Sequence, residues 1–116
     1  MKPEDIARAA AKALDSKKGV DIKVLSISDL TVVADYFVIC TGTSNTHLKT
    51  LSDACEETLP KLGAPCHHIE GRHGGTWVLL DFSGVVVHLF TGETREFYSL
   101  ERLWADAKPI DWSDEK

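Results

Sequence analysis

Residues 76–90 read TWVLLDF (76–82), then Ser83-Gly84, then VVVHLF (85–90). Two apolar runs separated by a Ser-Gly pair predict a β-hairpin, because glycine tolerates the positive φ that a tight turn requires. Side chains on a strand alternate between two faces, so each run has one purely apolar face and one mixed face. Pairing the two mixed sides forms a single surface, which we call the mixed face. Its members are Trp77, Leu79, Asp81, Val86, His88 and Phe90.

The mixed face combines large apolar side chains with an acid and a histidine, a composition that suits a docking surface. Each large apolar side chain left in water forgoes about 1.5–3 kcal/mol of burial, which a binding partner would recover. The alternative is that a second layer of the same protein covers this face. Sheets with one open face are common, so the residues alone leave both alternatives open.

Composition limits the classes of function. The 116 residues fit one domain, and the hydrophobic content of 43% and charged content of 27% are those of an ordinary globular protein. The net charge of −5 and the absence of a dense Lys/Arg cluster argue against direct nucleic-acid binding. No apolar run approaches the roughly 20 residues of a membrane span, so we expect a cytoplasmic protein or the mature form of an organellar one. The three cysteines, an odd number, predict free thiols.

The remaining sequence predicts helices and further strands around the hairpin. The resulting order predicts an α+β fold (an α/β sandwich) with a mixed sheet of about five strands. In the connector at residues 28–33 we expect Leu30, Val32 and Val33 to point inward, and we expect Pro60 to distort or end its helix. From Ala107 we expect a loose tail with Ile110 or Trp112 docked. The predicted elements are helices at 3–17 and 45–62, strands at 21–27, 35–41 and 66–70, and a short helix from Ser99 that carries Leu100, Leu103 and Trp104.

Three kinds of chemistry were considered. A strand that ends in Gly42-Thr43-Ser44 before a helix suggests a nucleotide-binding turn, although the turn lacks the lysine and glycine spacing of a phosphate loop. The group Cys66, His67, His68 and His73 suggests zinc, but it contains no CxxC or HxxxH pair. Asp81 and Asp35 each stand without the second acid that two-metal catalysis requires. We therefore expect a non-enzyme without metal or cofactor.

Three stretches together resemble the ribosomal silencing factors, the Iojap-like family: ADYFVICTGTSNTH (34–47), GTWVLLDFSGVVVHLF (75–90) and TREFYSLERLW (94–104). The resemblance runs from the first helix to about Asp106. It implies a single Iojap-like domain over residues 1–106, followed by an acidic tail over residues 107–116. It also implies a nucleotidyltransferase-like topology that has lost its catalytic acids, which agrees with the isolated Asp81.

The family resemblance further implies a translation repressor in the cytoplasm. Its partner would be the large ribosomal subunit, bound through ribosomal protein number fourteen, and binding would block joining of the small subunit. The rival hypotheses are nucleotide binding or residual nucleotidyltransferase activity at Gly42–Ser44, and a homodimer that buries the mixed face against itself. The contact residues that the resemblance implies are Trp77, Leu79, Asp81, His88, Phe90, Arg95 and Tyr98.

Overall fold

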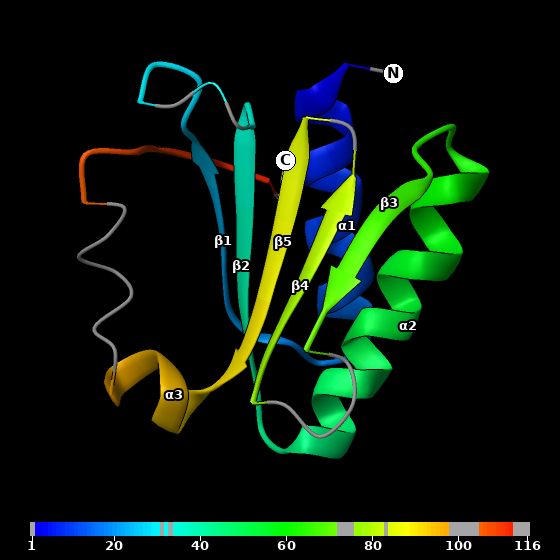
Figure 1. Cartoon of the computed structure of the whole chain (residues 1–116), viewed down its shortest axis with the longest axis vertical. Coiled ribbons are helices and arrows are strands. Elements are labelled where there is room, and N and C mark those ends of the chain that lie inside the picture. Colours follow the sequence, from blue (N-terminus) through cyan, green and yellow to red (C-terminus); the bar gives the residue numbers. More distant parts are fainter. Residues whose placement is uncertain are drawn as a thin grey trace.

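The computed structural model describes residues 2–30, 32, 34–71, 76–82, 84–97 and 105–112, without the side chains of residues 96 and 97. The described residues form one mixed six-stranded sheet in the order β3-β4-β5-β2-β1-β6 (Figure 1). Strands β2 and β5 are parallel, and all other neighbours are antiparallel. The elements are α1 (Pro3–Ser16), β1 (Val20–Ser26), β2 (Tyr36–Gly42), α2 (Asn45–Lys61), β3 (Cys66–Glu70), β4 (Trp77–Phe82), β5 (Val85–Thr91), α3 (Gly92–Phe97) and β6 (Lys108–Ile110).

The predicted hairpin is present as strands β4 and β5. Gly84 has a φ of +74° in the turn between them, the conformation for which a glycine was expected. The register confirms that the six residues of the mixed face lie on one side of the sheet: Trp77 lies opposite Phe90, Leu79 opposite His88, and Asp81 opposite Val86.

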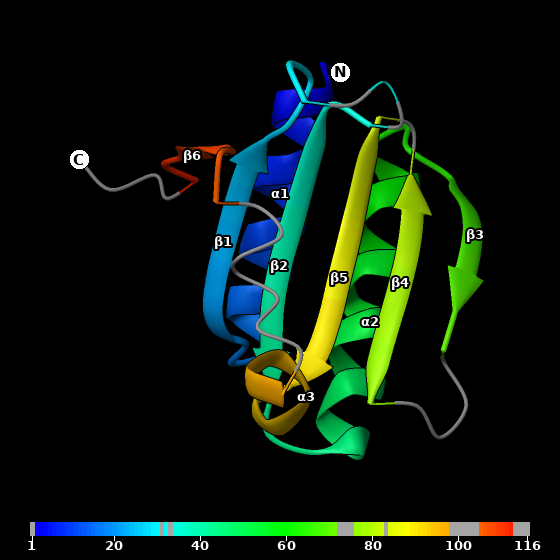
Figure 2. The same cartoon turned by 60° about the vertical axis from the view of Figure 1, so that its left-hand side comes forward.

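Helices α1 and α2 cover the other face of the sheet (Figure 2). Their apolar stripes pack on the inward side chains of the central strands, and β2, a nearly continuous apolar run, is buried along nearly its whole length. This core contains Ala7, Ala10, Leu14, Val38, Cys40, Leu48, Leu51, Cys55, Leu59, Val78, Leu80, Phe82, Val85, Val87 and Leu89, among others.

Helix α2 begins and ends with recognisable caps. The Ser44 hydroxyl accepts a hydrogen bond from the His47 N–H at 3.1 Å, so Ser44 is the N-cap of this helix. Pro60 does lie in the last turn. After it the backbone N–H of Gly63 bonds to the Pro60 carbonyl and that of Ala64 to the Leu59 carbonyl, while Gly63 adopts a φ of +92°. This pattern is a Schellman motif, which ends the helix tightly just after the proline.

The connector between β1 and β2 differs from the prediction. Leu30 is 52% exposed and Val32 is fully exposed, so the expectation that they point inward is wrong. Val33 lies outside the described residues. The connector lies at the end of the sheet beside the start of α1, and Leu30 and Val32 lie outside both apolar clusters (Figure 2).

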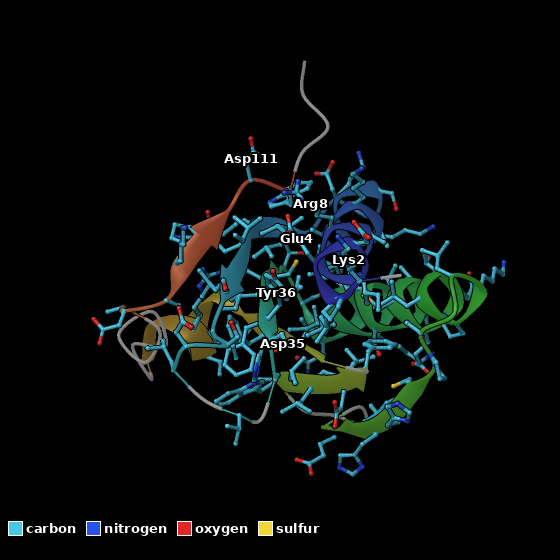
Figure 3. The ribbon with its side chains drawn as sticks, turned by 90° about the horizontal axis from the view of Figure 1, so that it is seen from above. Lys2, Glu4, Arg8, Asp35, Tyr36 and Asp111 are labelled. Carbon is cyan, nitrogen blue, oxygen red and sulfur yellow. The ribbon has the colours of Figure 1, made fainter. Side chains whose placement is uncertain are left out.

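The segment after Ala107 forms the sixth strand, which the sequence pattern did not indicate. Strand β6 pairs with β1, and the Trp112 indole donates a hydrogen bond to the Ile22 carbonyl at 3.3 Å, so the predicted docking of Trp112 is confirmed. Arg8 of α1 lies between Glu4 and Asp111: its guanidinium pairs with the Glu4 carboxylate at 2.7 Å and donates to the Asp111 carbonyl (Figure 3).

Helix α3 covers Gly92–Phe97, where the sequence predicted only a charged run. The helix predicted from Ser99, with Leu100, Leu103 and Trp104, lies outside the described residues. No helix of the described part of the chain has the length and hydrophobicity needed to cross a membrane.

Candidate docking surface

Strand β4 presents the accessible part of the mixed face. Its side chains alternate strictly, so that Val78, Leu80 and Phe82 are buried against the helices. The outward side chains of Trp77 and Leu79, two large apolar groups, are half-buried, and so is that of Asp81. These three therefore form a half-exposed row along one strand.

Strand β5 presents a buried part of the same face. His88 is 5% exposed and Phe90 1% exposed, and Val86 is buried as well. Val86 and Phe90 belong to a second apolar cluster with Phe37 and Ile39 of the neighbouring strand β2. The expectation of a surface open across both strands is wrong, because β5 lies between β4 and β2 and its side chains are packed from both sides.

Trp77 rests on aromatic rings of the buried part. Its ring centroid lies 5.9 Å from that of Phe90 in an edge-to-face arrangement, and 6.3 Å from that of His88. The indole Nε1–H donates to Nδ1 of His88 at 3.4 Å. The ring centroids of His88 and Phe37 lie 4.8 Å apart, and the angle between the two ring planes is 84°. Edge-to-face contacts of this kind add about 0.5–1.5 kcal/mol beyond the buried area.

Burial fixes the charge state of His88. Desolvation lowers the pKa of its imidazole to about 4, so the ring is neutral at neutral pH. Because Nδ1 accepts the indole hydrogen, the remaining ring proton is on Nε2. His88 thus acts as a neutral acceptor beneath Trp77.

Arg95, which the family resemblance placed among the contact residues, lies inside the protein. It is 5% exposed, and its guanidinium donates to the Thr41 hydroxyl at 2.7 Å and to the Asp21 carbonyl at 3.1 Å. The guanidinium carbon lies 5.5 Å from the centre of the Phe90 ring, a cation–π distance. Helix α3 follows β5 directly and lies across the ends of β2 and β5 (Figure 2), and Arg95 on this helix contacts Thr41 of β2 and Phe90 of β5.

The sequence prediction correctly named the residues of the half-exposed row. It also expected His88, Phe90 and Arg95 at the contact surface, whereas these three residues are buried. Tyr98 lies outside the described residues. Phe37 and Thr41 were missed as neighbours of the candidate site. The available signal was their position in the apolar run at residues 35–41, but the parallel pairing of β2 with β5 that brings them here has no local sequence signal.

The turn at Gly42, Thr43 and Ser44 is occupied by internal bonds. The Thr43 N–H donates to Nδ1 of His47 at 2.9 Å, and the other ring nitrogen of His47 lies 2.8 Å from the Lys17 carbonyl. A phosphate would need N–H donors such as that of Thr43. The turn therefore acts as a helix cap joined to the end of α1, and one N–H donor that a phosphate would need is already bonded.

The zinc hypothesis gains no support from the geometry. Within the described part of the chain, no three His, Cys, Asp or Glu side chains are grouped as metal ligands would be. His68 pairs with Glu70 at 2.8 Å on the exposed strand β3, and His73 lies outside the described residues.

An open pocket of about 300 Å³ lies at the N-terminal end of α1. The Tyr36 hydroxyl lies 3.4 Å from the Glu4 carboxylate there, and burial together with this carboxylate raises the pKa of the phenol (Figure 3). The pocket lining consists of Lys2, Pro3, Glu4, Ser28, Asp35 and Tyr36.

Comparison with known proteins gives a consistent result. The whole chain, residues 1–116, matches the RsfS family, described as ribosomal silencing factor during starvation. The chain is similar to the ribosomal silencing factor RsfS of Bacillus subtilis, with 36% identity over 111 residues that cover 96% of this chain and 94% of that protein. It is similar to the chloroplastic protein Iojap of Zea mays, with 34% identity over 109 residues that cover 90% of this chain and 46% of that protein. A crystal structure of a Chromobacterium violaceum protein has a TM-score of 0.87 and 33% identity, with 98% of both chains covered.

Proposed function

Because this chain belongs to the RsfS family of ribosomal silencing factors, the Iojap-like family, we propose that it is a translation repressor that binds the large ribosomal subunit and blocks joining of the small subunit. The family consists of non-enzymatic ribosome-binding regulators. The observation that carries the proposal to particular residues is the half-exposed row of Trp77, Leu79 and Asp81 on strand β4.

The proposed contact is with ribosomal protein number fourteen of the large subunit. Trp77 and Leu79 would supply the apolar centre, since large rings at the centre of an interface contribute most of the binding energy. Asp81 would pair with a cation of the partner and would set orientation and association rate more than affinity. Tyr98 remains a proposed contact from the resemblance, whereas His88, Phe90 and Arg95 are proposed to support the row from beneath.

The proposed mechanism is steric occlusion. A domain with a radius of gyration of 12.8 Å is large enough, once docked where the subunits meet, to keep the small subunit away. We propose that residues 1–106 form the acting domain and that the protein works in the cytoplasm. We also propose kinship with the nucleotidyltransferase topology, which the helix after the Gly42–Ser44 turn and the central parallel pair of strands support.

Co-sedimentation with purified large subunits tests the proposal. The wild-type protein should pellet with free large subunits and should reduce the fraction of joined ribosomes when small subunits are added. Trp77→Ala should lose at least tenfold in affinity, since removal of a central interface tryptophan costs about 2 kcal/mol or more. The matched control is Leu30→Ala, which removes another exposed apolar side chain from a different part of the surface and should bind like wild type.

Two results would contradict the proposal. Failure of the wild-type protein to pellet at low salt would remove the function itself. Equal loss of binding in Trp77→Ala and Leu30→Ala would leave the function standing but would place the contact elsewhere. Sedimentation equilibrium tests the rival homodimer. If a homodimer buries the same row, the wild-type protein should have a higher mass than Trp77→Ala.

A further inference from the structure

We propose that His88 is a positioning residue that selects one orientation of the Trp77 indole and so presents that ring to the large subunit, without touching the partner itself. The inference rests on the proposed function, because it concerns how the half-exposed row is organised for binding. It assigns His88 a role different from the direct contact that the family resemblance implied.

The first argument is the position of the two rings relative to solvent. Trp77 is half-buried on the outer strand of the hairpin, whereas His88 is 5% exposed on the next strand. The residue directly across the hairpin from Trp77 is Phe90, and His88 lies opposite Leu79, one step further along the same face. A partner that covers Trp77 would therefore be separated from His88 by the indole and by the Leu79 side chain.

The second argument is that the indole N–H has a side-chain acceptor in the observed flip. A tryptophan ring can rotate by about 180° about its χ2 bond, and the edge-to-face contact with Phe90 supplies no side-chain nitrogen or oxygen as acceptor. The bond from Nε1–H to Nδ1 of His88 at 3.4 Å exists in only one of the two flips. The imidazole therefore selects the flip.

The third argument is that the imidazole itself is held. Its ring stands edge-to-face on Phe37 at 4.8 Å, and it is packed within the sheet between β4 and β2. Because Nδ1 of His88 is held in place, its hydrogen bond also holds the Nε1–H of Trp77. The indole therefore has one orientation before the partner binds. Ordering an interface side chain in advance removes an entropy cost of binding, which corresponds to about a two- to tenfold gain in affinity.

The variants separate the acceptor from the bulk of the side chain. His88→Leu fills a similar volume without an acceptor, whereas the side-chain oxygen of His88→Asn lies close to the position of Nδ1. In a ¹H–¹⁵N spectrum, the indole resonance that disappears in Trp77→Phe identifies the Trp77 Nε1–H. We expect this resonance to shift and its proton to exchange faster in His88→Leu, and to stay near its wild-type position in His88→Asn.

Binding to large subunits is then measured by co-sedimentation for the same proteins. His88→Leu should bind about three- to tenfold more weakly than wild type, and His88→Asn should recover most of that loss. In the Trp77→Phe background, which has no indole N–H, His88→Leu should cause no further loss. This last comparison distinguishes positioning from general destabilisation, which would act in both backgrounds.

Three outcomes would overturn the inference: an unmoved indole resonance in His88→Leu, an unchanged affinity in that variant, or an equal loss of affinity in the Trp77→Phe background. Failure of the proposed function is recognised separately, because it appears in the wild-type protein before any variant is compared. The spectrum is recorded without ribosomes, so it also reports whether each variant is folded.

Discussion

At the scale of single residues, polar groups beneath the mixed face are used as internal supports. The Arg95 guanidinium donates to the Thr41 hydroxyl and the Asp21 carbonyl, and its carbon lies 5.5 Å from the Phe90 ring that supports Trp77. A buried charge is tolerated only where such partners compensate for lost hydration. Side chains that look like surface contacts in the sequence are therefore structural groups in the fold.

His88 should make stability depend on pH. The pKa of its imidazole is about 4 in the folded protein, against 6.5 for an ordinary histidine, so between these values the unfolded chain binds a proton that the folded chain refuses. The contribution of neutral His88 to the free energy of unfolding is therefore fully present above pH 6.5 and is lost as the pH falls toward 4. The loss is at most about 1.4 kcal/mol per pH unit.

Urea unfolding of wild type and His88→Leu at pH 7, 6, 5 and 4.5 measures this effect. As the pH is lowered, the free energy of unfolding should fall more steeply in the wild-type protein than in His88→Leu. The difference in slope should correspond to the uptake of about one additional proton on unfolding. Parallel curves for the two proteins would contradict the prediction.

The three cysteines should differ in reactivity. Burial raises the pKa of the Cys40 and Cys55 thiols to about 12, and both side chains are inaccessible. Cys66 is only half-buried on β3. Since the thiolate is the reactive form, a disulfide reagent at pH 8 should modify one thiol in the native protein and all three in denaturant. The variant Cys66→Ser should abolish the native reaction; a remaining fast thiol would show that the assignment is wrong.

At the scale of elements, β4 depends on a glycine that precedes it. Gly71, at the end of β3, has a φ of +79°, and a Cβ there would lie 2.1 Å from the Trp77 carbonyl oxygen. This contact is with backbone, so no side-chain rotation can relieve it. The close approach of the two chain segments fixes where the strand that carries Trp77 begins.

Gly71→Ala should therefore destabilise the protein more than Gly63→Ala. Gly63 also has a positive φ, +92°, but its Cβ would meet nothing within 4 Å, so alanine there adds only backbone strain of about 1–2 kcal/mol. Gly71→Ala adds the overlap with Trp77 and should cost at least about 2 kcal/mol more. Thermal or urea unfolding of the two variants provides the comparison, and equal losses would refute the importance of the close approach.

At the scale of the whole molecule, the C-terminal segment closes one edge of the sheet. Strand β6 pairs with β1, the Trp112 indole bonds to the Ile22 carbonyl, and Arg8 of α1 donates to the Asp111 carbonyl. Two contacts with β1 and one with α1 thus hold residues that the sequence pattern assigned to a tail. An uncovered sheet edge offers unpaired backbone groups to other chains.

Removal of residues 108–116 should lower the melting temperature by about 10 °C, which corresponds to roughly 2 kcal/mol in a domain of this size. The truncated protein should also self-associate as its concentration rises, because the edge of β1 is exposed. The milder variant Trp112→Ala keeps the strand and should show a smaller thermal shift without association. Calorimetry and sedimentation velocity test both expectations; an unchanged melting temperature after truncation would contradict them.

The sequence by itself determined the local elements and the mixed face. Alternation in residues 76–90 and a Ser-Gly turn are enough to specify the hairpin and its register, because strand faces repeat every two residues. Helical spacing and capping residues likewise specified α1 and α2 to within one residue at each end. These features depend on neighbours in the chain, which a linear pattern records.

Only the tertiary structure decided which part of the mixed face is accessible. His88 and Arg95 are buried because β5 is flanked by β2 and because α3 lies across the strand ends, and both relationships join segments far apart in the sequence. The sixth strand arises in the same way, since three residues form a strand only when β1 offers an edge to pair with. Burial depends on what packs against a residue from elsewhere in the chain, and periodicity within one segment carries no record of that.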